Sequence, residues 1–230
     1  LNERVTAEDL SGKSFDHVVV ATGITPRKPN IEGIDHPSVV SYIDVIQGNC
    51  HVGKTVAVIG AGGIGFDVSE LIMHKGISAA LERDVFAREW GIDFDNHPRG
   101  GVTGVAPQVE RADRQVYLLQ RKSSPVGRGL GKTTGWTHRI SLAQRGVVML
   151  NSVEYLKIDD DGLHITRDGT PSVLEVDSII ICAGQLPFRS LYDNLLALGE
   201  DVSLVGGAYE AAELDAKAAI SQASYMAAQI

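Results

Sequence analysis

A short glycine-rich run has the residue types and the spacing that dinucleotide chemistry uses. Glycines occupy the first, third and sixth positions of the run Gly60, Ala61, Gly62, Gly63, Ile64 and Gly65. The first glycine permits a tight turn, the second lets the backbone approach a pyrophosphate, and the third lets a helix pack closely on a strand. A helix that begins there directs its first N–H groups and its positive dipole end at the phosphates. The run therefore predicts a dinucleotide site.

A strand and a helix must flank these glycines if they are to position a phosphate. Residues 54–59 are a β-branched run typical of a buried strand. Residues 66–75 have helical spacing, with Val68, Leu71 and Ile72 on one face. Because a glycine pattern alone is a weak signal, these flanks are what favour a dinucleotide site over a glycine-rich packing turn.

The choice between NAD and NADP depends on the residue that follows the next strand. An acidic residue there binds the ribose 2′-OH of NAD, whereas an arginine favours the 2′-phosphate of NADP. If residues 77–81 formed that strand, Glu82 would have the usual spacing for NAD. However, residues 77–90 are more typical of a helix than of a strand.

Residues 115–119 have the stronger β-strand character, and Arg121 and Lys122 follow them. We therefore predict that this is the second strand, that residues 76–112 are an insertion, and that the cofactor is NADP(H). The Arg121 guanidinium would bind the phosphate as a fork and Lys122 as a point charge. The alternative, two basic residues at an exposed strand end, stays open.

A second glycine-rich segment, residues 127–133, resembles a P-loop but departs from it. The first glycine of GxxxxGK[ST] would have to stand at position 126, which is Val126. This difference argues against an ATPase. We expect the segment to fold over the adenosine phosphate with Lys132 and Thr133, the alternative being a plain loop before a helix over residues 134–145.

The composition excludes several other classes of protein. The 230 residues suffice for one large or two small domains and include 21 Lys and Arg against 29 Asp and Glu, a net charge of −8. This balance argues against a nucleic-acid partner, and the apolar runs are too short for a membrane partner. Cys50 and Cys182 have neither metal nor CxxC spacing, so we expect reduced thiols in a cytoplasmic protein and no thiol relay. The seven histidines also lack metal-ligand spacing, and we predict no metal site in this chain.

The rest of the chain predicts an α/β fold. Residues 16–23 and 177–184 are two strands that each end in glycine, and Asp-Gly turns divide residues 153–176 into a β-meander. Near the C-terminus we expect a strand over 202–205, a glycine turn and a helix over 211–227. The chain opens on Leu1 and reaches a core strand almost at once, which we interpret as part of a longer protein.

Four segments resemble the bacterial NADPH-dependent 2,4-dienoyl-CoA reductases, and the similarity runs over essentially the whole chain: residues 57–67, 119–122, 130–136 and 157–164. The last three are more specific than the glycine pattern. The resemblance implies a flavoprotein whose N-terminal TIM barrel carries FMN and a 4Fe-4S cluster. It also implies a glutathione-reductase-like FAD domain that is interrupted by an NADP(H) domain.

On this resemblance, residues 53–183 are a Rossmann-like NADP(H)-binding domain with a β-meander, inserted in a partial FAD-binding domain of residues 1–52 and 184–230. Gln120 then joins Arg121 and Lys122 at the cofactor. The implied flavin-facing residues are Thr22, Gly23, Ala183, Gly184, Gly206 and Gly207, with a helix from Glu213. Ala208 stands where the broader glutathione-reductase pattern has an aspartate, which leaves flavin contact open at that position.

The resemblance also implies the function. NADPH bound to this chain would deliver hydride to FAD, for the reduction of unsaturated fatty acyl-CoA in β-oxidation. The partners would be NADPH and a barrel in the same polypeptide, which would hold the catalytic residues, so this chain alone is expected to be inactive. Two alternatives are the same region of another barrel-plus-FAD enoate reductase and a non-catalytic NADP-binding module.

Overall fold

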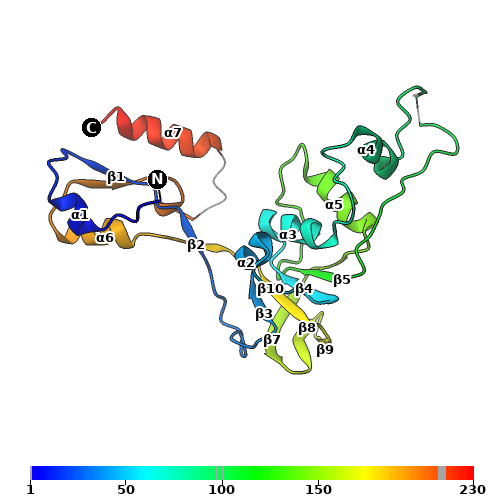
Figure 1. The fold of residues 1–230 in the computed structure, drawn as a ribbon. Coiled ribbons are helices and arrows are strands. Elements are labelled where there is room, and N and C mark those ends of the chain that lie inside the picture. Colours follow the sequence, from blue (N-terminus) through cyan, green and yellow to red (C-terminus); the bar gives the residue numbers. More distant parts are fainter. Residues whose placement is uncertain (1, 97, 100, 212–215) are drawn as a thin grey trace. The chain divides into compact units, whose positions relative to one another are not determined.

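The computed structural model describes residues 2–96, 98–99, 101–211 and 216–230 (Figure 1). The chain divides into a larger compact unit of residues 28–183 and a smaller one of residues 1–27 with 184–230. One boundary between the units follows residue 183. The other boundary follows residue 27 instead of residue 52, because strand β3 (Val39–Ser41) pairs with β10 (Ser178–Ile181) inside the larger unit.

A five-stranded parallel sheet forms the centre of the larger unit. Its order is β3-β10-β4-β5-β6, and every neighbouring pair is parallel; the remaining three strands are β4 (Thr55–Ile59), β5 (Gln115–Leu119) and β6 (Val148–Leu150). The prediction that residues 115–119 are the strand beside β4 is confirmed. Residues 77–81 form no strand, so the spacing argument for Glu82 does not hold.

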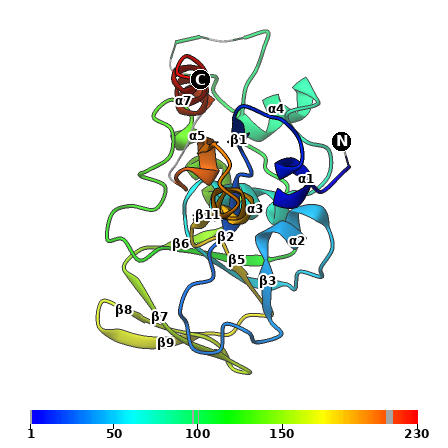
Figure 2. The same cartoon turned by 90° about the vertical axis from the view of Figure 1, so that its left-hand side faces the viewer.

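The two faces of this sheet have different covers. Helices pack on one face: α2 (Tyr42–Gln47), α3 (Gly63–Met73) and α5 (Gly135–Gln144). The predicted meander covers the other and lies below the sheet in Figure 2: β7 (Val153–Asp159), β8 (Gly162–Arg167) and β9 (Thr170–Leu174). Strand residues alternate between faces, so Val56 and Val58 join the helix-side core while Ala57 and Ile59 join the meander-side core. Burial on both faces explains the uninterrupted apolar run of β4.

The helices follow the sequence predictions with two differences. In α3, Val68 and Ile72 are buried as expected, but Leu71 is 48% exposed. The helix expected over residues 77–90 is shorter, since α4 spans only Arg83–Trp90. The backbone before it takes a left-handed turn at Gly76 (φ +75°) and an extended conformation at Glu82 (φ −130°), and a helix cannot continue through either.

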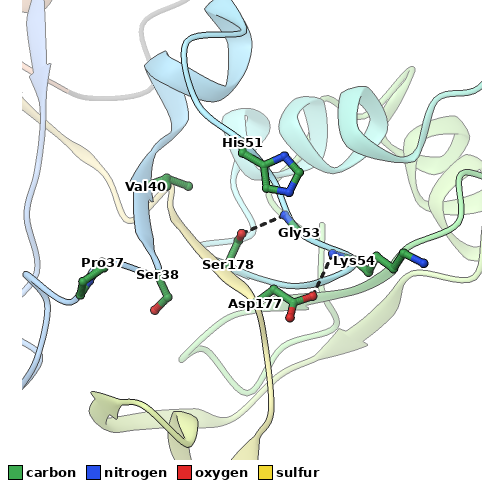
Figure 3. A pocket seen from close by; sticks show the side chains of 8 residues that line it. All are labelled: Pro37, Ser38, Val40, His51, Gly53, Lys54, Asp177 and Ser178. Carbon is green, nitrogen blue, oxygen red and sulfur yellow. Dashed lines mark hydrogen bonds between the residues drawn. The ribbon is translucent and has the colours of Figure 1, made fainter.

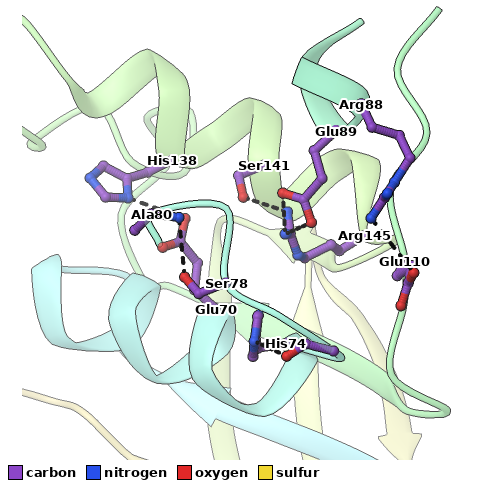
Figure 4. Close-up of polar contacts among 11 residues, drawn as sticks. Glu70, His74, Ser78, Ala80, Arg88, Glu89, Glu110, His138, Ser141 and Arg145 are labelled. Atoms are coloured by element: carbon purple, nitrogen blue, oxygen red, sulfur yellow. Dashed lines mark hydrogen bonds and ion pairs between the residues drawn. The ribbon is translucent and has the colours of Figure 1, made fainter. Parts of the chain in front are cut away.

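A buried ion pair fastens α4 to α5 (Figure 4). The Arg145 guanidinium donates to both carboxylate oxygens of Glu89, at 3.1 and 3.0 Å, and to the Ser141 hydroxyl at 2.8 Å. The two charged side chains are only 11% and 9% exposed. The insertion between β4 and β5 is thus attached to α5 by one guanidinium nitrogen that contacts both oxygens of Glu89.

The smaller unit contains two short pairs of strands. In it, β1 (Val18–Val20) is parallel to β12 (Val202–Leu204), and β2 (Ile24–Pro26) is antiparallel to β11 (Gln185–Pro187). Its helices are α1 (Ala7–Ser11), α6 (Ser190–Ala197), a 3-10 turn η1 (Gly206–Ala208) and α7 (Ala216–Ala227). Residues 212–215 of the expected C-terminal helix, Glu213 among them, lie outside the described residues. No helix in the described part of the chain is long and apolar enough to cross a membrane.

Candidate dinucleotide-binding site

Two glycines of the run 60–65 are required by the protein's own packing. Gly60 ends β4 with φ +110°, and a Cβ there would lie 2.3 Å from the Cys182 carbonyl oxygen. A Cβ on Gly65 would lie 1.9 Å from the carbonyl oxygen of Gly60. Real Cβ atoms do not approach backbone so closely, so Gly60 is required by the neighbouring backbone after β10 and Gly65 by the close approach of α3 to the end of β4.

Gly62 and Gly63 have no such reason to be glycine. Both are exposed, and, apart from the adjoining residues and the backbone of α3 itself, no described atom lies within 4 Å of a Cβ added to either. Gly62 has φ −83°, a backbone conformation that other residues adopt readily. These two positions begin α3, where the first N–H groups lack acceptors within the helix. Open space in front of unpaired donors is what a phosphate needs.

Arg121 and Lys122 lie at the same edge of the sheet as the glycine turn. Strands β4 and β5 are parallel with Ile59 opposite Leu119, and the Gly60 N–H donates to the Leu119 carbonyl at 2.9 Å. Both basic side chains are exposed, and neither pairs with a carboxylate within the part of the chain that the structure describes. The tertiary structure thus brings the open space at Gly62 and Gly63 and two cations to one edge, at the carboxyl ends of parallel strands.

The Gln120 side chain is engaged with its own loop. Its Nε2 donates to the carbonyls of Lys122 and Ser124, at 3.0 and 2.6 Å, so its donors support the loop that carries Arg121. Sequence reasoning missed Asn151, whose Nδ2 donates to the Ser123 carbonyl at 2.7 Å. The available signal was a polar residue directly after β6, the strand next to β5 in the sheet.

Two buried groups near this edge are held in their neutral forms. Burial raises the pKa of the Tyr155 phenol well above its ordinary value, although the positive charge of Arg121 lowers it in part. Burial also raises the pKa of the Cys182 thiol to about 12. A thiol with this pKa is protonated at neutral pH and is a poor nucleophile.

The segment 127–133 lies against the first turn of α3. A Cβ on Gly127 would be 2.7 Å from Cζ of Phe66, the residue after the last motif glycine. Lys132 and Thr133 are exposed in this segment, and the Thr133 carbonyl accepts from the Trp136 indole at 3.0 Å. Trp136 itself packs edge-on against Trp90, with ring centroids 6.4 Å apart, so its role here is packing.

Four of the six predicted flavin-facing residues come together in the smaller unit. A Cβ on Gly207 would lie 3.4 Å from the carbonyl carbon of Gly23, so these glycines are neighbours. The Thr22 hydroxyl donates to the Phe188 carbonyl at 2.5 Å, and the Gly206 N–H donates to the Gln222 side chain at 2.8 Å.

The other two lie elsewhere. Gly184 is at the far end of the β2–β11 pair, where its carbonyl accepts from the Arg27 N–H at 3.0 Å. Ala183 belongs to the larger unit, and its Cα would be 3.1 Å from a Cβ on Gly60. Ala183 is therefore a neighbour of the glycine turn of that unit.

A cavity of about 520 Å³ lies at the opposite, amino-terminal edge of the parallel sheet (Figure 3). There the Asp177 carboxylate accepts hydrogen bonds from the backbone N–H groups of Lys54 and Thr55, at 2.9 and 2.8 Å. The Ser178 hydroxyl accepts a hydrogen bond from the backbone N–H of Gly53 at 3.0 Å. These side chains satisfy backbone donors at the start of β4. Since ligands of parallel sheets bind at the carboxyl ends of the strands, this cavity is not the dinucleotide candidate.

One group among the described residues could offer three ligand atoms to a metal ion: Asp159, Asp161 and His164. However, the Lys157 ammonium lies 2.6 Å from the Asp159 carboxylate and His164 lies 2.7 Å from it. Hydrogen bonds from Lys157 and His164 lower the pKa of Asp159 to about 2. This cluster at the β7–β8 turn is therefore an ion-pair network, in which the Lys157 ammonium already neutralises the Asp159 carboxylate.

A sequence model of the pyridine nucleotide-disulphide oxidoreductase family matches residues 2–205. Among curated relatives, a metal reductase of Desulforamulus reducens is 24% identical over 216 residues, which are 90% of this chain and 29% of that protein. A cinnamate reductase of Clostridium sporogenes is 22% identical over 90% of this chain and 26% of its own length. The chain thus spans less than a third of the length of these relatives.

Solved structures show the same fold. A 2-naphthoyl-CoA reductase in complex with 2-naphthoyl-CoA superposes with a TM-score of 0.74 and 21% identity over 100% of this chain and 29% of that one. An amine oxidase for 6-hydroxypseudooxynicotine from Pseudomonas geniculata gives a TM-score of 0.69 and 21% identity, over 98% of this chain and 30% of that one. The predicted fold class, a Rossmann-like α/β fold with a parallel sheet, is confirmed.

Proposed function

Because the chain belongs to the pyridine nucleotide-disulphide oxidoreductase family, we propose that it is the NADP(H)-binding portion of a flavin-dependent 2,4-dienoyl-CoA reductase. Family membership makes the protein an oxidoreductase whose cofactors are a flavin and a nicotinamide nucleotide. The observation that carries the proposal is the difference in surroundings among the glycines of the run 60–65. Gly60 and Gly65 are closed in by backbone, whereas Gly62 and Gly63 face open space.

The larger unit offers N–H donors and positive charges for the phosphate groups of an NADP(H) molecule. The N–H groups at Gly62, Gly63 and Ile64 would bind the pyrophosphate, since the helix dipole adds to their hydrogen bonds. Arg121 and Lys122 would bind the 2′-phosphate, because both are exposed and neither has a carboxylate partner among the described residues. Lys132 and Thr133, in the segment beside α3, would cover the adenosine phosphate.

When bound, NADPH supplies a hydride and FAD accepts it. The contribution of this chain is to bind and orient both, which accounts for the absence of a proposed catalytic residue among those described. Thr22, Gly23, Gly206 and Gly207 would lie on the flavin side of the smaller unit. An N-terminal barrel of the same polypeptide would carry FMN, a 4Fe-4S cluster and the acyl-CoA site. The chain covers under a third of its relatives, which leaves room for such a barrel.

The second candidate is a 2-enoate reductase of the same architecture, because a cinnamate reductase is among the relatives and cinnamate is a 2-enoate. The two candidates differ in the proposed barrel and share this cofactor portion. The cysteines of this chain are both free, and we place either enzyme in the cytoplasm.

The proposal is tested in two steps. Calorimetric titration of the chain with NADPH and NADH should give the tighter binding with NADPH. The protein that contains this chain with its barrel should then oxidise NADPH with a 2,4-dienoyl-CoA and not with cinnamate. Tighter binding of NADH would contradict the cofactor assignment, turnover of cinnamate alone would favour the second candidate, and absence of any turnover would favour a non-catalytic module.

A further inference from the structure

The loop that carries Arg121 and Lys122 is held almost entirely through its carbonyl oxygens. The Gln120 carbonyl accepts from the Val153 N–H at 3.0 Å, and the Lys122 carbonyl accepts from the Ser152 N–H at 3.1 Å. Ser152 belongs to the connection between β6 and β7, and Val153 is the first residue of β7. The path of the loop is therefore fixed by that neighbouring connection, which is not part of the glycine motif.

Within this connection, Asn151 supplies a bond that depends on its side chain. Its Nδ2 donates to the Ser123 carbonyl at 2.7 Å, while its Oδ1 accepts from the Arg167 guanidinium at 3.4 Å. The next residue, Ser152, has φ +56°, a left-handed conformation that costs free energy in a residue other than glycine. The connection is thus held in a strained turn, and Asn151 spans from β8 on one side to the cation-bearing loop on the other.

We propose that Asn151 is a positioning residue that sets the preference of this site for NADPH over NADH. It does not need to touch the cofactor. By holding the Ser123 carbonyl, it fixes the backbone from which Arg121 and Lys122 project, and so fixes where their charges lie. The inference rests on the proposed NADP(H) site and adds the residue that orders its 2′-phosphate end.

If Asn151 positions Arg121 and Lys122, its replacement should affect cofactor binding differently than if it only stabilises the fold. NADH has a hydroxyl where NADPH has the 2′-phosphate, so an error in the placement of Arg121 affects only NADPH. A fold defect would weaken the binding of both NADPH and NADH, because both would bind their pyrophosphate at the glycine turn that contains Gly62. The ratio of the two affinities therefore separates the two roles.

The test compares Asn151→Leu with wild type and with Asn49→Leu. Leucine is close in size to asparagine and neutral, so it removes the hydrogen bonds without adding a charge. Asn49 also donates from Nδ2, to the Gln47 side chain at 2.9 Å, but it precedes β4 at the other edge of the sheet. Calorimetry with NADPH, NADH and adenosine 2′,5′-bisphosphate measures the ratio on the full chain.

In Asn151→Leu, affinity for NADPH and for the bisphosphate should fall about three- to tenfold, the net effect of one hydrogen bond, with NADH unchanged. Asn49→Leu should leave all three unchanged. Equal affinities for NADPH and NADH in wild type would overturn the proposed cofactor and this inference with it. If the ratio of NADPH to NADH affinity in Asn151→Leu equals that of wild type, whether because neither affinity changes or because both fall equally, the inference alone is overturned. If Asn151→Leu does not fold, Asn151→Ala is titrated and judged by the same ratio.

Discussion

A Cβ atom on Gly65 would lie 1.9 Å from the carbonyl oxygen of Gly60, so these two residues are in backbone contact across the turn between β4 and α3. A Cβ added to Gly62 or Gly63, which lie between them, would meet no described atom within 4 Å beyond the adjoining residues and the backbone of α3. One motif thus contains residues that the fold requires and residues that only a ligand would require. Substitutions at the two kinds of position should have different effects.

Gly62→Val should abolish dinucleotide binding and leave the fold intact. The valine side chain would fill the space in front of α3, and φ −83° places no strain on it. Gly65→Ala should instead lower the free energy of unfolding, because its Cβ overlaps the backbone. Calorimetry and thermal unfolding measure the two effects.

Gly12→Val is the matched control for Gly62→Val. Gly12 is at the end of α1 in the smaller unit, and the nearest atom to a Cβ there is 4.0 Å away. The Gly12→Val variant should bind the dinucleotide with the same affinity as the wild type. If Gly62→Val also binds normally with an intact fold, the run 60–65 is a packing turn and the site assignment is wrong.

Arg121→Ala should weaken NADPH binding by about 1.5–3 kcal/mol, the range of a hydrogen bond to a charged group, and should change NADH binding little. The reason is that Arg121 is exposed at the sheet edge beside the glycine turn and has no competing carboxylate among the described residues. Calorimetric titration with both cofactors checks it. The control is Lys54→Ala, which removes an exposed cation at the opposite edge. An equal loss for both cofactors would contradict a 2′-phosphate role.

Glu89→Gln should destabilise the attachment of α4 by about 3 kcal/mol, because it leaves the Arg145 charge buried with its partner neutralised. The Arg145 side chain is 11% exposed, so water cannot replace the lost carboxylate. Hydrogen exchange of the α4 amides should rise. Glu110→Gln is the control, since its pair with Arg88 is long, at 3.9 Å, and half exposed. Unchanged protection in Glu89→Gln would show that the ion pair does not stabilise the attachment of α4.

The isolated chain should not retain FAD. The sequence contains one strand–GxGxxG–helix unit, over residues 54–75, and we assign it to NADP(H). The flavin-side residues of the smaller unit would contact at most the ring end, without the helix terminus that binds a pyrophosphate. After incubation with excess FAD and desalting, the visible spectrum should show no flavin band. A stoichiometric yellow complex would contradict the assignment of the two units.

Several features were predictable because they depend on neighbours in the chain. The glycine spacing, the β-branched run before it and the Asp-Gly turns specified β4, the start of α3 and the meander, since local backbone geometry decides each of them. The β-strand character of residues 115–119 also predicted β5 correctly. The extent of α4 was predicted wrongly, because helix propensity does not show the backbone conformations that Gly76 and Glu82 adopt.

The tertiary structure alone decided which residues share an edge and which glycines face open space. Strand order places Gln120 beside Gly60 and residues 151–153 beside the loop of Arg121, and no spacing along the chain encodes that order. The role of Asn151 was hidden for the same reason, because its hydrogen bond joins residues 28 positions apart. Sequence thus determined the local units and their chemistry, whereas packing determined how they meet, because contacts between distant segments form only when strands pair and bury their faces together.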